Sequence, residues 1–336
     1  MRKELGTFVL LVVLCIVLAI LNPSFLDPSN LQNLARLIGI YGIFSIGLGL
    51  VIITGGIDLS VGSVFALLGV LLSILLVDWR LPAAFAGALP FLPAWLALGL
   101  GALVAVLAVV AITTLLGAVN GLLITKVKIQ PFIVTLCGLL FYRGLARFVA
   151  NDETKGFGAA TGFETLKDMA TGSVFGIPTP FIILIAVSAV AWVVLHRSIF
   201  GRYLFAVGRS ETAARYSGIN ADGVIAGAYI LCGLLAGVAG ILLAFYTNSI
   251  SPSSHGNFYE LYGIAAAVLG GCSLRGGEGS IVGILIGTAL LQVLQNLVNL
   301  LGIPSSLNFA VMGAVILLGV LADQLLRQRN AAQVGK

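Results

Sequence analysis

The residues best suited to chemistry lie in one short stretch, Gly55 to Ser63, with the sequence GGIDLSVGS. This stretch joins two long apolar runs with almost no polar linker between them. Asp58 supplies a carboxylate at or within an apolar environment, where a charge is costly unless protein or water surrounds it. The glycines allow a backbone course that a regular helix does not. The pattern is typical either of a helix cap, for which Asp58 and Ser60 are suited, or of a broken helix beside a solute path.

Neutral polar and aromatic side chains elsewhere in the apolar runs could extend such a path. A neutral polar solute is bound by uncharged hydrogen-bonding groups and stacking rings rather than by a fixed charge. Amides inside a membrane can equally form hydrogen bonds between helices, so both interpretations stay open. The residues predicted to line a path are Gly55, Gly56, Asp58, Ser60, Asn120, Phe132, Asn248, Tyr262 and Asn296.

No set of residues indicates catalysis or a bound cofactor. A P-loop requires Gly-Lys followed by Ser or Thr, and the only Gly-Lys pair is Gly335-Lys336, the last two residues. The four cysteines are isolated from one another, and His196 and His255 lie far apart, so neither a metal site nor a disulfide is predicted. We therefore expect a protein that is not an enzyme and that depends on a partner or an ion gradient for energy.

The composition indicates that these residues are surrounded by lipid. The 336 residues are 59% hydrophobic and only 9% charged, with a mean hydropathy of +1.11, whereas about a quarter of the residues in soluble domains are charged. Apolar runs of about 18 or more residues, long enough to cross a bilayer as helices, recur along the chain. We expect an all-α, polytopic transmembrane helical bundle in which residues 1–336 form a single integral membrane domain.

About ten spans are predicted, at residues 5–21, 34–53, 59–77, 95–117, 130–149, 179–195, 223–246, 258–274, 280–301 and 307–326. Prolines lie between or beside most of these runs, as expected for helix ends. Residues 81–94 are apolar but short and broken by proline, which favours a re-entrant or interfacial piece. Residues 114–138 and 288–313 have similar patterns and start from opposite sides, a weak indication of an inverted repeat.

The distribution of basic residues predicts the orientation of the chain. With the N-terminus inside, about two thirds of the 18 Lys and Arg residues fall on the inner side, which agrees with the positive-inside rule. Both termini are then cytoplasmic, the polar loop 151–178 lies outside, and the basic loop 196–222 lies inside. The expected location is the cell inner membrane, with multiple spans.

Several stretches resemble one family of membrane proteins, the permease subunits of ABC importers for ribose, xylose, arabinose and galactofuranose. The resemblance includes GGIDLSVGS at 55–63, FGRYLFAVGRSETAARYSGIN at 200–220, LGGCSLRGGEG at 269–279 and the tail at 281–323. These stretches occur in the family's order over nearly the whole chain, and branched-chain amino acid permeases are more distant relatives. The resemblance implies a type II-like importer permease that forms the pathway for a monosaccharide.

The resemblance also implies partners and a coupling site. The partners would be an ABC ATPase subunit, a soluble sugar-binding protein, membrane lipid and a second permease copy, identical or paralogous, with no nucleic acid and no cofactor. The residues expected to couple the chain to the ATPase are Arg209, Glu211, Ala213, Ala214, Arg215, Gly218 and Ile219. The chain departs from the family at Tyr262, where relatives often have aspartate, so an ABC permease for a solute other than a sugar stays an alternative.

Three alternatives remain at this stage. An ion-coupled secondary transporter would act alone and would need buried acidic groups, for which Asp58 and Glu260 are the only candidates. An ABC permease for a small polar solute other than a sugar would have the same architecture. An intramembrane enzyme would need paired catalytic groups within the membrane, which the sequence does not offer.

Overall fold

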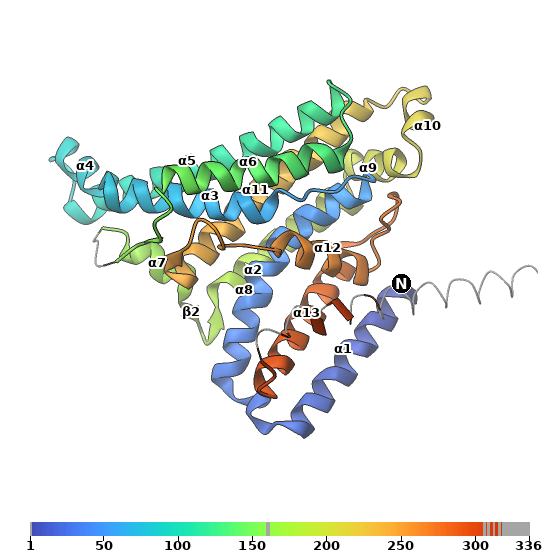
Figure 1. Cartoon of the computed structure of the whole chain (residues 1–336), viewed down its shortest axis with the longest axis horizontal. Helices are drawn as coiled ribbons and strands as arrows, with labels where there is room; N and C mark the ends of the chain where they lie inside the picture. The colour runs from blue at the N-terminus through green and yellow to red at the C-terminus, as the bar shows by residue number, and fades with distance from the viewer. Residues whose placement is uncertain are drawn as a thin grey trace, which may run out of the picture.

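The computed structural model consists almost entirely of helices, which agrees with the predicted all-α bundle (Figure 1). The structure describes residues 2–158 and 162–304, and beyond them only residues 307, 310, 311, 313, 314 and 317. A membrane favours this class of fold, because a helix satisfies its own backbone hydrogen bonds where no water can do so.

The bounds of the elements follow the apolar runs closely. The helices are α1 (Arg2–Leu21), α2 (Pro28–Ile53), α3 (Val61–Ser73), α4 (Leu81–Ala88), α5 (Ala94–Thr125), α6 (Pro131–Val149), α7 (Glu164–Thr171), α8 (Thr179–His196), α9 (Ile199–Arg209), α10 (Glu211–Tyr216), α11 (Ala221–Thr247), α12 (Tyr259–Leu269) and α13 (Ile281–Leu300). A 3₁₀ turn, η1 (Pro23–Leu26), precedes α2, and a π-helical turn, η2 (Ile74–Asp78), extends α3. Two antiparallel pairs join β1 (Lys155–Gly156) to β4 (Ser249–Ile250) and β2 (Ser173–Val174) to β3 (Ile177–Pro178).

Eight helices in the described part of the chain are long and apolar enough to cross a membrane, against about ten predicted spans. The predicted span at 258–274 contains only the 11 residues of α12, too few to cross alone. The predicted span at 307–326 falls largely outside the described residues. Residues 81–94 hold the eight-residue α4 and a turn, packed against α5. The prediction was therefore wrong about the length of the helix at 258–274.

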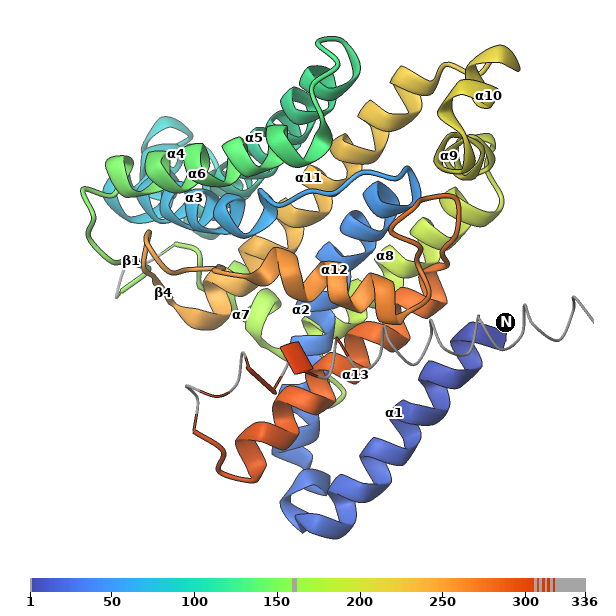
Figure 2. The same ribbon diagram turned by 45° about the vertical axis from the view of Figure 1, so that its right-hand side comes forward.

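The long helices differ in how deeply they are buried. The most apolar part of α2 is 83% buried within the chain, and those of α3 and α11 are each 72% buried, whereas that of α1 is only 6% buried. Figures 1 and 2 show α1 at the edge of the molecule along α13, while α2 and α11 pass through its middle. The core that positions any internal site is therefore built by α2, α3 and α11.

The closest helix pair, α5 with α11, is packed through small residues. A Cβ at Gly117 would overlap the carbonyl oxygen of Tyr229, and one at Gly233 would overlap the carbonyl oxygen of Thr113. A Cβ at Gly237 would meet the hydroxyl of the same threonine. Small residues allow such close approach between helices in lipid, where van der Waals packing is a principal source of association.

This packing predicts that Gly233→Ala destabilises the protein. The added methyl has no room against the Thr113 carbonyl, and overpacking of this kind costs about 1–3 kcal/mol. The midpoint of thermal unfolding in detergent should therefore fall. The matched control is Gly99→Ala on the same helix pair, because nothing lies within 4 Å of a Cβ at that glycine. Equal unfolding midpoints for the two variants would contradict the role assigned to the close approach.

Candidate functional site

A non-helical segment, residues 54–60, connects the end of α2 to the start of α3 inside the bundle (Figure 1). Gly55 has φ +85°, in the left-handed region that favours glycine. The N–H groups of Gly55 and Gly56 donate to carbonyls in the last turn of α2, which ends that helix. Gly56, Asp58 and Ser60 are buried. The helix break that the glycines predicted is present, and its polar groups need partners from other helices.

Two such partners hold the carbonyl oxygen of Ile57. The hydroxyl of Tyr229 on α11 donates to it at 3.1 Å, and the hydroxyl of Thr135 on α6 donates to it at 3.2 Å. A buried backbone carbonyl without a partner would cost free energy comparable to a lost hydrogen bond. The break is thereby fastened to two helices that are distant from it in the sequence.

The Asp58 carboxylate organises the other end of the segment. Asp58 is 3% exposed, and its Oδ1 accepts the backbone N–H of Ser60 at 2.9 Å and the Ser60 hydroxyl at 2.6 Å. Ser60 is the N-cap residue of α3, but its side chain makes no capping hydrogen bond. The predicted cap therefore takes a different form, in which Asp58 fixes the cap residue instead of the first turn of the helix.

A directed series of hydrogen bonds extends from this carboxylate across the bundle. The hydroxyl of Tyr142 on α6 donates to Oδ1 of Asn120 at 3.0 Å. The Asn120 amide on α5 donates to the Ser60 hydroxyl at 3.1 Å, and this hydroxyl donates to Asp58. All three bonds join buried groups. Predicted site residues Asp58, Ser60 and Asn120 are thus brought together, with Tyr142 as an addition.

A second buried carboxylate, Glu260 on α12, lies against the first turn of α3. It is 5% exposed and lies directly against Gly62, where an added Cβ would overlap Oε2 of the carboxylate. Arg143 on α6 donates to the carbonyl oxygens of Gly62 at 3.2 Å and His255 at 2.7 Å. The loop before α12 therefore reaches α3 inside the bundle, which is why α12 is shorter than predicted.

The other predicted path residues have different surroundings. Phe132 is 52% exposed on α6, and Asn248 is exposed at the end of α11, with φ +51°. Tyr262 is buried among aromatic rings of α2 and α12. Asn296 exchanges hydrogen bonds with Asn30 at 2.7 and 3.2 Å, which joins α13 to α2. The predicted site residues that lie together are therefore Gly55, Gly56, Asp58, Ser60 and Asn120.

The predicted coupling loop folds into α9 and α10. The Ser210 hydroxyl accepts the N–H of Ala213 at 3.2 Å and so caps α10, and Gly218 ends this helix with φ +80°. The N–H of Ile219 donates to the carbonyl of Ala214 at 3.0 Å. Ala214 is only 4% exposed, so its methyl packs against the chain itself, whereas Ala213 is exposed.

The exposed face of α10 carries charges of both signs. Arg215 donates to Oε1 of Glu211 through Nε at 3.0 Å and Nη2 at 2.7 Å, one turn apart on the helix. The Arg215 guanidinium also contacts Asp222. The hydrogen bond to Asp222, and to a lesser extent the one to Glu211, raises the pKa of Arg215. Arg209 is exposed in the last turn of α9. This end of the molecule therefore presents a short, capped and charged helix beside small side chains.

Sequence reasoning missed several residues that fasten the break. Thr135, Tyr142 and Tyr229 lie in apolar runs where a single hydroxyl is common, and no spacing distinguishes them. Arg143 could have been identified from the sequence, since a guanidinium in the middle of an apolar run requires polar partners. In the described part of the chain no three His, Cys, Asp or Glu residues could hold a metal ion, and all four cysteines are free.

Comparison with known proteins extends over most of the chain. Residues 30–320 match the family described as branched-chain amino acid transport system / permease component. The ribose import permease protein RbsC of Bacillus subtilis (strain 168) is 40% identical over 323 residues, covering 96% of this chain and 93% of the relative. RbsC of Escherichia coli (strain K12) is 39% identical over 320 residues, covering 95% and 93%.

A further relative is the D-allose transport system permease protein AlsC of Escherichia coli (strain K12), 31% identical over 322 residues, covering 96% of this chain and 91% of the relative. No solved structure matches the chain significantly. The family match includes the break at 54–60 and α9 to α11, so the resemblance noted in the sequence is confirmed. The chain belongs to the branched-chain amino acid transport system / permease component family.

Proposed function

We propose that the chain is the membrane subunit of an ATP-driven ABC importer and forms the pathway for a monosaccharide, either ribose or another pentose or hexose. The observation that carries this proposal is the 40% identity to a ribose import permease over 96% of the chain. A D-allose permease among the relatives also favours a sugar. A relative named as an autoinducer 2 import permease, 30% identical, keeps a different small polar solute as the alternative.

The proposed importer needs three protein partners. An ABC ATPase would hydrolyse ATP, because this chain has no P-loop. A soluble sugar-binding protein would deliver the solute from outside, and a second permease, identical or paralogous, would complete the pathway. The whole chain would act as one integral membrane domain of the inner membrane. Both termini, the loop 196–222 and α10 would be cytoplasmic, and the loop 151–178 would be external, as the basic residues favour.

The hydrogen bonds of the buried acids argue against ion coupling by this chain alone. Asp58 accepts from the N–H and hydroxyl of Ser60, and Glu260 lies against Gly62, whose carbonyl accepts from Arg143. Carboxylates that bind and release a coupling ion must exchange their partners during transport. These two carboxylates instead hold the first turn of α3, which supports a positional role for them.

In the proposed mechanism the break at 54–60 is the movable part of the pathway. Residues 57–59, at its centre, make no backbone–backbone hydrogen bonds, so their dihedral angles can change without unwinding a helix. Hinges in proteins are short segments of this kind, located at the ends of elements. Gly55, Gly56, Asp58, Ser60 and Asn120 would line or control the path, and α10 would transmit the force of the ATPase.

The function predicts solute uptake that depends on the partners. Vesicles containing this chain and its ABC ATPase partner, supplied with the sugar-binding protein, should take up labelled ribose only when ATP is present. Excess unlabelled ribose should compete, and allose should compete less strongly. Vesicles without the ATPase are the control. Uptake of ribose by the chain alone, driven by a proton or sodium gradient, would contradict the proposal.

The exposed position of Ala213 predicts that Ala213→Arg blocks docking of the ATPase. A long cation in a closely fitted contact should weaken docking by about 3 kcal/mol, which is on the order of a hundredfold in affinity. The tagged variant should be present in the membrane at the normal level, but the ATPase should no longer co-purify with it. Ala213→Ser is the matched control and should bind the ATPase normally. Normal co-purification with Ala213→Arg would show that α10 is not the coupling element.

Asp58 accepts two hydrogen bonds from Ser60, which predicts different outcomes for its replacement by asparagine and by leucine. Asp58→Asn keeps an oxygen that can accept from Ser60, so assembly and uptake should be largely preserved. Asp58→Leu leaves the buried N–H of Ser60 without a partner, at a cost of about 1–3 kcal/mol. The amount of folded permease in the membrane, or uptake per permease, should fall accordingly. Normal uptake by the leucine variant would remove Asp58 from the pathway.

A further inference from the structure

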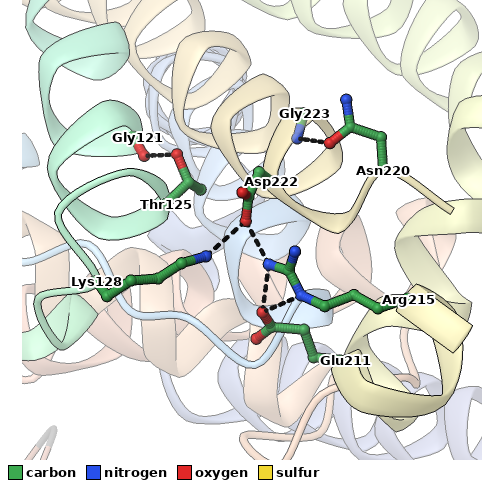
Figure 3. A network of polar contacts seen from close by, with 8 residues as sticks. All are labelled: Gly121, Thr125, Lys128, Glu211, Arg215, Asn220, Asp222 and Gly223. Atoms are coloured by element: carbon green, nitrogen blue, oxygen red, sulfur yellow. Dashed lines mark hydrogen bonds and ion pairs between the residues drawn. The ribbon is translucent and has the colours of Figure 1, made fainter.

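Four charged side chains from three separate segments meet beside α10 (Figure 3). We call Lys128, Glu211, Arg215 and Asp222 the charged cluster. Lys128 Nζ lies 2.8 Å from Asp222 Oδ1, and the Arg215 guanidinium contacts the same oxygen while it also binds Glu211. Asp222 therefore joins the turn between α5 and α6 to α10, across 94 residues of sequence between Lys128 and itself.

Asp222 is the centre of this cluster and the least exposed of its members. Its side chain is 20% exposed, against 57% for Lys128 and 39% for Arg215. It lies in the first turn of α11, where a carboxylate is also favoured by the unpaired N–H groups of the helix end. Asn220, rather than Asp222, caps this helix by accepting the N–H of Gly223 at 3.0 Å. The charge of Asp222 is therefore not required for the cap.

Lys128 has an unusual backbone conformation for its residue type. Its φ is +64°, a region in which residues with a side chain are uncommon. It lies in the short turn between α5, which ends at Thr125, and α6, which begins at Pro131. A lysine held in this conformation needs surrounding contacts that favour it. The ion pair with Asp222 is one such contact and fixes the tip of the turn onto α11.

Behind the charged cluster, α5 and α11 form a single closely packed unit. A Cβ at Gly121 would lie 2.9 Å from Cα of Ala226. The Thr125 hydroxyl, almost fully buried, donates to the carbonyl of Gly121 at 2.8 Å and so adds no polar group to the contact (Figure 3). A displacement of the end of either helix therefore carries the other with it.

The same two helices reach the break at 54–60. Asn120 of α5 donates to Ser60, and Tyr229 of α11 donates to Ile57. Tyr229 lies seven residues beyond Asp222, which corresponds to roughly 10 Å along a helix. The charged cluster and the break are therefore attached to the two ends of one short, rigid pair of helical segments.

We propose that the charged cluster transmits movement of α10 to α5 and α11, and through them to the break at 54–60. This inference rests on the proposed function, because α10 moves only if an ATPase docks on it. Lys128 and Asp222 are positioning residues: they touch neither solute nor nucleotide, and they fix the direction in which α10 pushes. A purely stabilising role would be small, since exposed ion pairs contribute little to the free energy of unfolding.

The test uses Asp222→Asn and Lys128→Gln in the complete transporter in vesicles. Both variants should unfold at the normal temperature and should co-purify with the ATPase. ATP hydrolysis stimulated by ribose-loaded binding protein should fall about fivefold, the lower end of coupling between sites in proteins. Lys128→Arg keeps the charge and should retain most of the stimulation. Unchanged stimulation in both Asp222→Asn and Lys128→Gln would overturn the proposal.

The matched control is Arg147→Gln, which removes another exposed ion pair. Arg147 Nε lies 2.6 Å from Asp152 Oδ1, with both side chains more than half exposed, at the opposite end of α6. This variant should show normal stimulation and uptake. A loss as large as that of Asp222→Asn would mean that any lost surface charge has this effect, and it would also overturn the proposal. Absence of ATP-dependent uptake by the unaltered chain would instead contradict the proposed function.

Discussion

The fold depends on satisfying the backbone and side-chain polar groups of a non-helical segment in the interior of a membrane protein. Residues 57–59 make no backbone–backbone hydrogen bonds, and lipid offers none. The carbonyl of Ile57 accepts from the hydroxyls of Tyr229 and Thr135. The Asp58 carboxylate accepts from Ser60, whose hydroxyl in turn accepts from the amide of Asn120. Because these partners come from α5, α6 and α11, the break holds together helices that lipid alone would leave free to separate.

A second interruption precedes α12 and is satisfied in the same way. Arg143 donates to the carbonyl of His255 in the loop before α12 and to that of Gly62 in α3, and the Glu260 carboxylate lies against the same glycine. The two interruptions therefore meet at the first turn of α3. In chain order, α2 is followed by the break, α3, η2, α4 and α5, whereas α11 is followed by a stretch containing β4 and then by α12 and α13.

Much of the architecture could be predicted from the sequence because lipid restricts the choice of structure so strongly. Apolar runs predicted the long helices, and the glycines of GGIDLSVGS predicted the break. The neighbours of the break could not be predicted, since helical spacing defines a face but not the helix that it meets. Asn120 was singled out by its polarity, whereas Tyr142 was not. The inward orientation of Ala214 and the pairing of Lys128 with Asp222 likewise depend on tertiary contacts between distant segments.

The charged cluster has a physical property suited to switching rather than to holding the fold together. Its side chains are partly exposed, so each ion pair changes the free energy of unfolding by about 1 kcal/mol or less. A transport cycle, however, alternates between arrangements whose free energies differ by only a few kcal/mol, and a contact acts through the difference it makes between them. Contacts of about 1 kcal/mol can therefore bias the switch substantially while leaving global stability unchanged. The close glycine contacts make α5 and α11 move as one stiff unit. The weak ion pairs of the charged cluster attach the end of this unit to α10, and they can be rearranged in every transport cycle.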